Sequence, residues 1–227
     1  MSYNYNKSYW NDRYSKVGGK RTVGKRDWSE DQYSKFISQH SKVLKLCLEA
    51  YCKLGLILDF GCGVGRWVSL LNSVFDDYIG VDITEQAIIE SQKTYPDKKF
   101  LHMSGDFNIN ICPQTIWTHV VLQHIIDDDL LQHNIAQFYN IIDDNGTVVI
   151  TESHNDNKIF KNHYISHRSS DEYQSLFNNI GFETIYCKEL IPQHHTIIFK
   201  KTRVIITHKT SLPLTEASIT SYPTPNI

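Results

Sequence analysis

Strand-like and helix-like segments alternate along the chain, and this alternation restricts the possible fold more than any other feature of the sequence. Short apolar runs typical of buried strands are separated by amphipathic segments typical of helices. The expected strands are residues 54–60, 77–82, 98–103, 116–122, 147–151, 182–190 and 196–200, and the expected helices are 31–51, 64–75, 85–94, 127–142 and 171–179. Because a strand, a crossover helix and a second strand form the unit of parallel sheets, the sequence predicts an α/β fold around a mostly parallel sheet.

The two ends of the chain differ from this middle part. Only the last two expected strands follow each other without a helix, so we expect them to pair antiparallel. Residues 203–227 contain three prolines and many serines and threonines, which predicts a loose C-terminal tail. Residues 1–30 are polar and aromatic, with little periodicity. The regular α/β unit is therefore expected to end near residue 202.

The composition excludes several classes of protein. Lys and Arg total 23 and Asp and Glu total 25, so the formal net charge of −2 favours neither nucleic acid nor an anionic membrane. No apolar run of about 18 residues is present, and the first ten residues lack the apolar core of a signal peptide. Five cysteines and eleven scattered histidines show no convincing metal-ligand spacing. We therefore expect free thiols, a cytoplasmic location and no metal site.

Three glycines follow the first expected strand directly. The segment LILDFGCGVGRW, residues 56–67, contains Gly61, Gly63 and Gly65. In an open parallel sheet ligands bind beyond the carboxyl ends of the strands, and glycine lets a ligand approach the backbone. The expected helix 64–75 would add free N–H groups that suit an anion. The spacing G-x-G-x-G differs from the dinucleotide fingerprint and from a phosphate-binding P-loop, so a nicotinamide oxidoreductase is disfavoured.

On these residues the chain resembles the class I S-adenosylmethionine-dependent methyltransferases, whose first motif is similar to LDFGCGVG. Asp82, at the end of the second expected strand, resembles the acid that accepts hydrogen bonds from both ribose hydroxyls. The segment SGDF, residues 104–107, is similar to the motif that meets the adenine. The resemblance covers about residues 55–200. It implies a doubly wound sheet of seven strands with the last strand antiparallel, helices on both faces, and S-adenosylmethionine as the cofactor, with S-adenosylhomocysteine as its product.

The resemblance and the loop chemistry together give a set of expected cofactor-binding residues. These are Asp59, Gly61, Cys62, Gly63, Gly65, Asp82, Ile83, Asp106, Phe107, Leu122 and Arg21. Some alternatives stay open, since Asp82 could be a helix cap and Asp106 a simple turn residue. Cys62 is expected to be a small neighbour of the cofactor rather than a nucleophile. Arg13 is a second candidate, beside Arg21, for pairing with the cofactor's carboxylate.

Two histidines are candidate general bases. Methyl transfer from a sulfonium is an in-line displacement, so the nucleophile must be held close to the methyl carbon in a dry site. If the nucleophile is an alcohol, a base assists, and histidine titrates in the right range. His124 follows the fourth expected strand and His154 follows the fifth, with Glu152 less favoured. The alternative for His124 is a packing role, and His119 is expected to be buried structure.

The expected organisation is an N-terminal lid and helix in residues 1–52, a methyltransferase domain in 53–202 and the tail in 203–227. The acceptor is expected to be a small polar hydroxyl compound, with a sugar or nucleotide-sugar as the leading candidate. This choice rests on fold-level analogy, a histidine-rich site and the lack of a basic surface. Alternatives are a small-molecule N-methyltransferase, a protein substrate, or a non-catalytic partner subunit that binds S-adenosylmethionine. Nucleic acid and membrane partners are not expected, and the oligomeric state stays open between monomer and homodimer.

Overall fold

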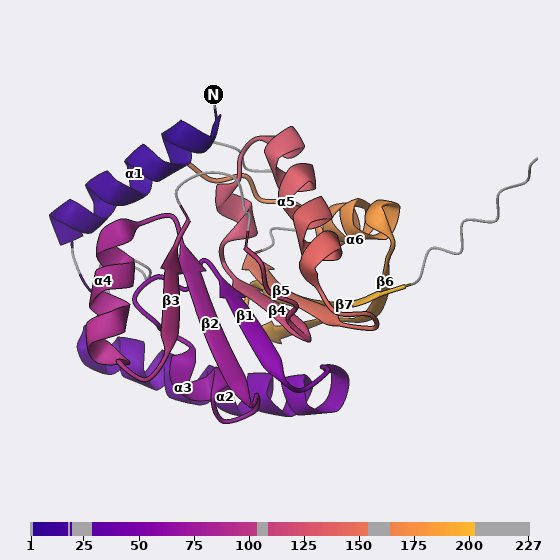
Figure 1. Cartoon of the computed structure of the whole chain (residues 1–227), viewed down its shortest axis with the longest axis horizontal. Coiled ribbons are helices and arrows are strands. Elements are labelled where there is room, and N and C mark those ends of the chain that lie inside the picture. The colour runs from indigo at the N-terminus through magenta and orange to yellow at the C-terminus, as the bar shows by residue number, and fades with distance from the viewer. Residues whose placement is uncertain (1, 18, 20–28, 104–108, 154–163, 203–227) are drawn as a thin grey trace, which may run out of the picture.

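The computed structural model describes residues 2–17, 19, 29–103, 109–153 and 164–202. Its centre is a sheet of seven strands in the order β3-β2-β1-β4-β5-β7-β6 (Figure 1). The strands are β1 Leu56–Phe60, β2 Asp77–Asp82, β3 Lys99–His102, β4 Thr115–His119, β5 Thr147–Ser153, β6 Phe182–Ile191 and β7 His194–Lys201. The first five strands pair parallel, and β7 pairs antiparallel with both β5 and β6. The predicted α/β fold with an antiparallel last strand is confirmed.

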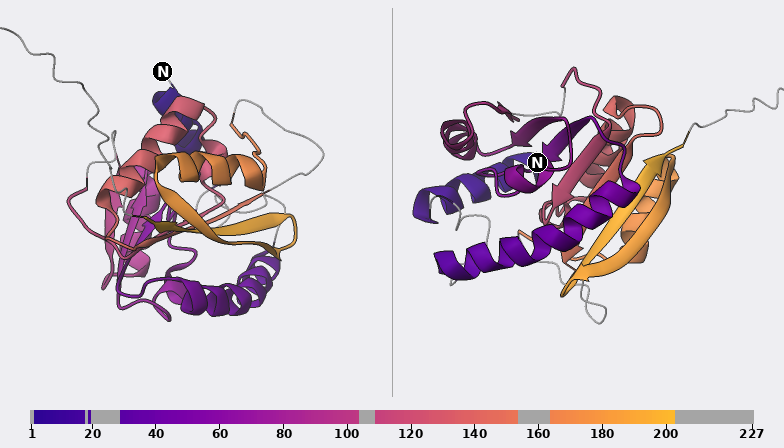
Figure 2. Two further views of the ribbon diagram at one scale, coloured as in Figure 1. Left: turned by 90° about the vertical axis from the view of Figure 1, so that its right-hand side faces the viewer. Right: turned by 90° about the horizontal axis from the view of Figure 1, so that it is seen from below.

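Helices cover both faces of the sheet (Figure 2). They are α1 Ser2–Val17, α2 Glu30–Tyr51, α3 Val68–Leu71, α4 Glu85–Thr94, α5 Asp128–Ile141 and α6 Ser170–Ile180, together with the 3-10 helix η2 Leu122–His124. Residues of α2, α3 and α4 share one apolar cluster with the sheet, and residues of α5 and α6 share a second. The sheet is therefore buried on both sides, as its continuous apolar strands require.

Local sequence signals set the ends of two long helices. At the start of α2, the Ser29 side chain accepts the N–H of Gln32, and the Gln32 side chain accepts the N–H of Ser29. Ser169 and Glu172 form the same capping box at the start of α6, which Gly181 ends in a left-handed conformation with φ 114°. These reciprocal bonds satisfy backbone donors that a helix leaves unpaired at its first turn.

Two predicted elements are wrong in their bounds by more than two residues. The expected helix 64–75 contains only the short α3, because the preceding residues form successive turns. A helix of four residues contributes little of the N-terminal charge that a longer helix would supply. The expected fourth strand 116–122 ends at His119, because Val120 has a positive φ of 58° and η2 follows. Both corrections lie at the carboxyl edge of the sheet, where the chain turns sharply.

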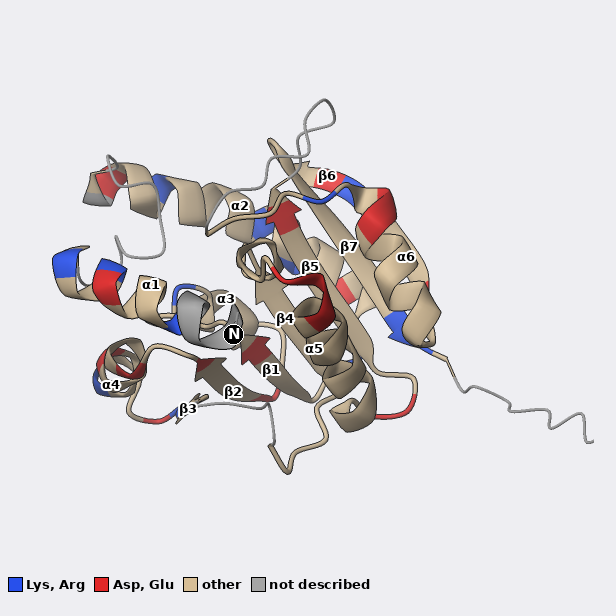
Figure 3. Ribbon diagram, turned by 90° about the horizontal axis from the view of Figure 1, so that it is seen from above, with Lys and Arg blue, Asp and Glu red and all other residues tan. Residues whose placement is uncertain are grey.

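Helix α1 crosses above this carboxyl edge. It contacts α4, and Figure 3 looks down on α1 lying beside α4 above the ends of the strands. None of the described helices is long and apolar enough to cross a membrane. Residues 203–227, predicted to form a loose tail, lie outside the described residues.

Candidate active site

A cavity of about 1230 Å³ lies at the carboxyl ends of β1, β2, β4 and β5. This edge of an open parallel sheet is where ligands bind. Helices α1 and α2 and the turn between β6 and β7 supply further walls. Since a single small-molecule pocket has roughly 300–1,000 Å³, this cavity has room for two small molecules side by side.

The loop after β1 presents bare backbone to the cavity. The N–H groups of Gly61 and Cys62 donate to the carbonyl oxygen of Val81 at 2.8 and 3.0 Å, which ties the loop to β2. Gly61 and Gly63 have φ values of 78° and 55°, in the left-handed region that favours glycine. A Cβ at Gly61 would lie 2.5 Å from a methyl carbon of Val121. The loop therefore keeps this shape only with glycine at position 61.

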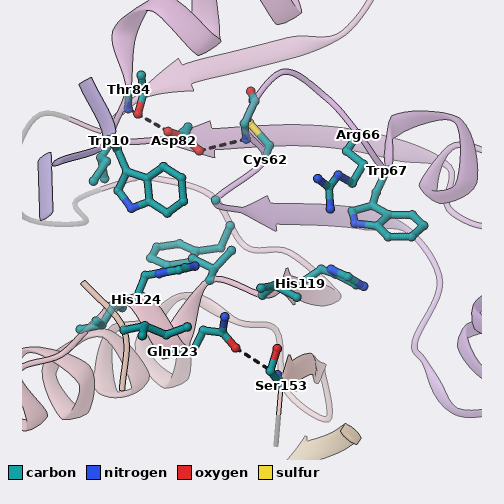
Figure 4. A pocket seen from close by; sticks show the side chains of 18 of the residues that line it. Trp10, Cys62, Arg66, Trp67, Asp82, Thr84, His119, Gln123, His124 and Ser153 are labelled. Atoms are coloured by element: carbon teal, nitrogen blue, oxygen red, sulfur yellow. Dashed lines mark hydrogen bonds between the residues drawn. The ribbon is translucent and has the colours of Figure 1, made fainter. Parts of the chain in front are cut away.

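Asp82 joins this loop to the start of α4. Its Oδ2 accepts the N–H of Gly63 at 2.9 Å, and its Oδ1 accepts the N–H of Thr84 at 2.8 Å (Figure 4). Burial raises the pKa of Asp82, and the hydrogen bonds from Thr84 and Gly63 oppose that rise. A carboxylate offers about four acceptor positions, so Asp82 keeps acceptor capacity for a ligand in the cavity that it lines.

Three expected cofactor-binding residues lie beneath the cavity wall instead of lining it: Asp59, Gly65 and Leu122. Asp59 is buried, and its Oδ2 accepts the hydroxyl of Tyr78 at 2.8 Å. Burial raises the pKa of Asp59 to about 7. Its side chain therefore supports the strand below the loop, and any contact with a ligand would have to come from neighbouring backbone.

His124 lines the cavity from the end of η2. Its Nδ1 lies 2.9 Å from the carbonyl oxygen of Tyr164, and the Trp10 ring packs edge-on against it at 4.9 Å. Because a carbonyl only accepts, Nδ1 carries the proton and Nε2 keeps the lone pair. Burial lowers the pKa of His124 to about 4, so the imidazole is neutral at neutral pH.

Glu152, the less favoured candidate base, holds the turn before His124. Its Oε1 accepts the N–H groups of Val121 and Leu122 at 3.0 and 2.9 Å and the hydroxyl of Thr118 at 3.3 Å. Its Oε2 accepts the N–H of Gln123 at 3.2 Å. The buried carboxylate of Glu152 thus accepts four hydrogen bonds. It influences the site by fixing the position of the turn that carries His124.

Comparison with known proteins identifies the family. A family model described as "Methyltransferase domain" matches residues 39–186.

The chain belongs to the class I S-adenosylmethionine-dependent methyltransferases.

Solved structures share the fold of this methyltransferase. The DhpI–SAH complex aligns with a TM-score of 0.69 and 14% identity, covering 88% of this chain and 97% of that one. An S-adenosylmethionine-dependent methyltransferase from Clostridium acetobutylicum aligns with a TM-score of 0.62 and 13% identity, and the alignment covers 84% of this chain and 98% of that one. CalS10, an amino pentose methyltransferase from Micromonospora echinaspora, aligns with a TM-score of 0.59 and 11% identity, and the alignment covers 78% of this chain and 93% of that one. A search of curated protein sequences found no match.

The cofactor of this methyltransferase is S-adenosylmethionine. One end of the cavity has the chemistry that this group needs. The glycine loop offers backbone that a ligand can approach, and Asp82 has acceptor capacity for ribose hydroxyls. Ile83, Ala87 and Met103 add apolar wall beside Asp82. The residues present therefore fit the cofactor at this end.

The other expected site residues divide into two groups. Cys62 and Ile83 line the cavity, and burial raises the pKa of the Cys62 thiol well above its usual value, so this cysteine stays protonated. Four residues lie outside the described part of the chain: Asp106, Phe107, His154 and Arg21. Their roles in this methyltransferase stay predictions.

The far end of the cavity contains residues that the sequence did not reveal as site residues. They come from α2, from the segment after the glycine loop, from the ends of β4 and β5, from η2 and from the start of β7. They are Phe36, His40, Arg66, Gln123, Ser153 and His194, together with His119, which is buried as predicted and also lines the cavity. No sequence spacing links these positions, because they are distant along the chain.

Helix α1 packs its aromatic side chains at the cavity. The Tyr9 ring stacks on the Tyr164 ring at 4.9 Å, and the Tyr14 hydroxyl bonds to the carboxylate of Glu90 on α4. Arg13 lines the cavity from the same helix. The aromatic residues of α1 therefore contact α4 and Tyr164 as well as His124.

Proposed function

We propose that this methyltransferase transfers the methyl group of S-adenosylmethionine to a hydroxyl of a small polar acceptor, with a sugar or nucleotide-sugar as the leading candidate. The observation that carries this proposal is the neutral imidazole of His124 in a cavity wall, with Nδ1 committed to the Tyr164 carbonyl. An unprotonated Nε2 can accept a proton from a hydroxyl.

In this proposal the cofactor lies along the glycine loop. Asp82 accepts its ribose hydroxyls, and the backbone at Gly61 and Gly63 allows close approach. Arg13 lines the cavity and is a cation that can pair with the carboxylate of the cofactor. Asp106 and Phe107 keep the adenine role and Arg21 a carboxylate role that the sequence predicts for them.

When bound, the cofactor supplies a methyl group activated by a sulfonium. The remaining tasks belong to this chain. The cavity holds the acceptor hydroxyl beside the cofactor, and α1 covers it to exclude water. His124 takes the hydroxyl proton at Nε2, while the Tyr164 carbonyl stabilises the resulting imidazolium through Nδ1.

Two alternatives receive less support. An N-methyltransferase would admit an amine, and the cationic side chain of Arg66 in the far end of the cavity disfavours a protonated amine there. A non-catalytic subunit would be expected to have a blocked acceptor space, whereas this cavity exceeds the size of one ligand pocket.

Two measurements test the proposal. Calorimetric titration with S-adenosylhomocysteine should give binding, and titration with NAD should give none. Turnover on a panel of sugars, nucleotide-sugars, phenols and small amines should then favour hydroxyl acceptors. Binding of NAD alone would contradict the cofactor assignment. Binding of S-adenosylhomocysteine with turnover only on amines would overturn the O-methyltransferase activity.

A further inference from the structure

The far end of the cavity gathers donors and cations around one buried imidazole. His119 is 9% exposed and lines the cavity at the end of β4. Neither of its ring nitrogens has a hydrogen-bond partner among the residues that the structure describes. A buried polar atom without a partner is rare in folded proteins and often marks a position that a ligand or water completes.

Two other side chains at this end of the cavity are hydrogen-bond donors. Arg66 points into it from the segment after the glycine loop (Figure 4), and its Nε donates to the Tyr33 hydroxyl at 2.9 Å. The Trp67 ring lies 4.6 Å from the His119 ring, and the Trp67 Nε1–H, which can only donate, has no partner within the described part of the chain. The three side chains thus offer donors and one permanent positive charge.

Other histidines surround His119. His40 and His194 line the same end of the cavity. Burial, and then the nearby Arg66, His194 and His40, lower the pKa of His119 well below its usual value, so its imidazole is neutral. His194 Nδ1 lies 2.9 Å from the Pro192 carbonyl oxygen, and its Nε2 lies 3.1 Å from the Ser153 hydroxyl.

No carboxylate side chain of the described residues lines this end of the cavity. Asp82 is the only acidic residue among the described residues that line the cavity, and it lies at the opposite end (Figure 4). A half-buried guanidinium and buried donors without partners among the described residues, in a part of the cavity that no described carboxylate lines, are complementary to an anion. A neutral imidazole still has one N–H to donate, so His119 can take part without being charged.

From this arrangement we infer that the acceptor is an acid, and that its phosphate ester or carboxylate binds between Arg66, Trp67 and His119. This rests on the proposed function and narrows its acceptor class from a small polar hydroxyl compound to one that carries an anionic group. The anion fixes one end of the acceptor while its hydroxyl reaches His124. Neutral sugars would then be poor substrates.

The test uses the full chain saturated with S-adenosylhomocysteine and three probes of one carbon skeleton: glycerol 3-phosphate, glycerate and glycerol. Calorimetry should show that at least one anion binds 10- to 100-fold more tightly than glycerol, about the effect of a charge-assisted hydrogen bond. A preference for the phosphate or for the carboxylate identifies which anion the site takes. Equal binding of all three probes would overturn the inference.

Variants locate the anion. Arg66→Met and His119→Gln should each weaken binding of the preferred anion about tenfold or more, whereas Arg66→Lys should retain part of it. Lys42→Met is the control, because it removes a cation at an exposed position of α2 that does not line the cavity. It should leave anion binding unchanged. If Arg66→Met instead abolishes S-adenosylhomocysteine binding in a folded protein, Arg66 serves the cofactor and the inference fails.

The two proposals fail in distinguishable ways. If S-adenosylhomocysteine does not bind the wild-type protein, the proposed function itself is wrong. If S-adenosylhomocysteine binds and neutral sugars are methylated as fast as their phosphates, the methyltransferase activity stands and only the acidic acceptor is wrong.

Discussion

The Glu152 carboxylate at the end of β5 accepts the backbone N–H of Leu122 in η2 at 2.9 Å. This bond and its neighbours attach the turn that carries His124 to the central sheet. A backbone turn held by a buried carboxylate moves little, so the imidazole keeps a fixed position in the cavity. Glu152 is therefore a positioning residue.

Glu152→Gln should lower both stability and turnover. The amide retains one acceptor oxygen but turns an NH₂ group toward a backbone donor, so we expect a loss of about 1–3 kcal/mol in the free energy of unfolding. Turnover should fall more than S-adenosylhomocysteine affinity, because the turn carries His124, whereas the backbone of Gly61 and Cys62 is hydrogen-bonded to Val81 of β2. Urea unfolding and initial rates measure the two effects. Glu183→Gln, at an exposed position of β6, is the control and should leave both unchanged. Equal behaviour of the two variants would refute the positioning role.

His124→Ala should reduce turnover by about 100- to 10,000-fold, the range for loss of a general base. Affinity for S-adenosylhomocysteine should stay near the wild-type value, since the imidazole acts on the acceptor. His133→Ala, at an exposed position of α5, removes an imidazole far from the chemistry and should keep full activity. Full turnover of His124→Ala would exclude this residue as the base.

Turnover should not show the fall in rate near pH 6.5 that protonation of an ordinary catalytic histidine causes. An ordinary imidazole loses its base form below about pH 6.5. Burial lowers the pKa of His124 to about 4, so the neutral base persists down to that pH. Titration of His124 should therefore cause no loss of turnover between about pH 8 and pH 6. A loss of rate centred near pH 6.5, absent from His124→Ala, would contradict the burial of this group.

Asp82→Asn should weaken S-adenosylhomocysteine binding by roughly 10- to 100-fold. The amide removes acceptor capacity for the ribose and sets its NH₂ group against the N–H of Gly63 or Thr84. Asp76→Asn, at an exposed position just before β2, controls for the loss of one negative charge. Unchanged affinity in Asp82→Asn would mean that the cofactor does not use this carboxylate.

Gly61→Ala should disrupt the cofactor loop. The new methyl group would lie 2.5 Å from a Val121 methyl carbon, and alanine disfavours the φ of 78°. We expect S-adenosylhomocysteine binding to fall at least tenfold, because backbone strain of this kind costs about 1–3 kcal/mol. In the double variant with Val121→Ala the clash is removed and the strain remains, so binding should recover in part. If binding does not recover in the double variant, the whole loss comes from backbone strain at position 61.

Local signals in the sequence predict most of the fold. Apolar periodicity identifies the strands and most helices, and the Ser29–Gln32 and Ser169–Glu172 capping boxes act over a few residues. The glycine spacing and the acid at position 82 point to the cofactor because they follow directly on strand ends. Where the prediction was wrong, at residues 64–67 and at Val120, positive φ values at nearby positions redirect the chain. Those conformations depend on packing, such as that of Gly61 against Val121.

What the sequence determined by itself is the α/β fold and the cofactor loop, since both depend on neighbours in the chain. Only the tertiary structure decided that Arg66, His119 and His194 meet at one end of the cavity, and that Glu152 holds a turn about 30 residues away. Their side chains come from different strands and loops, and the choice among possible hydrogen-bond partners is made only when the sheet brings those segments together.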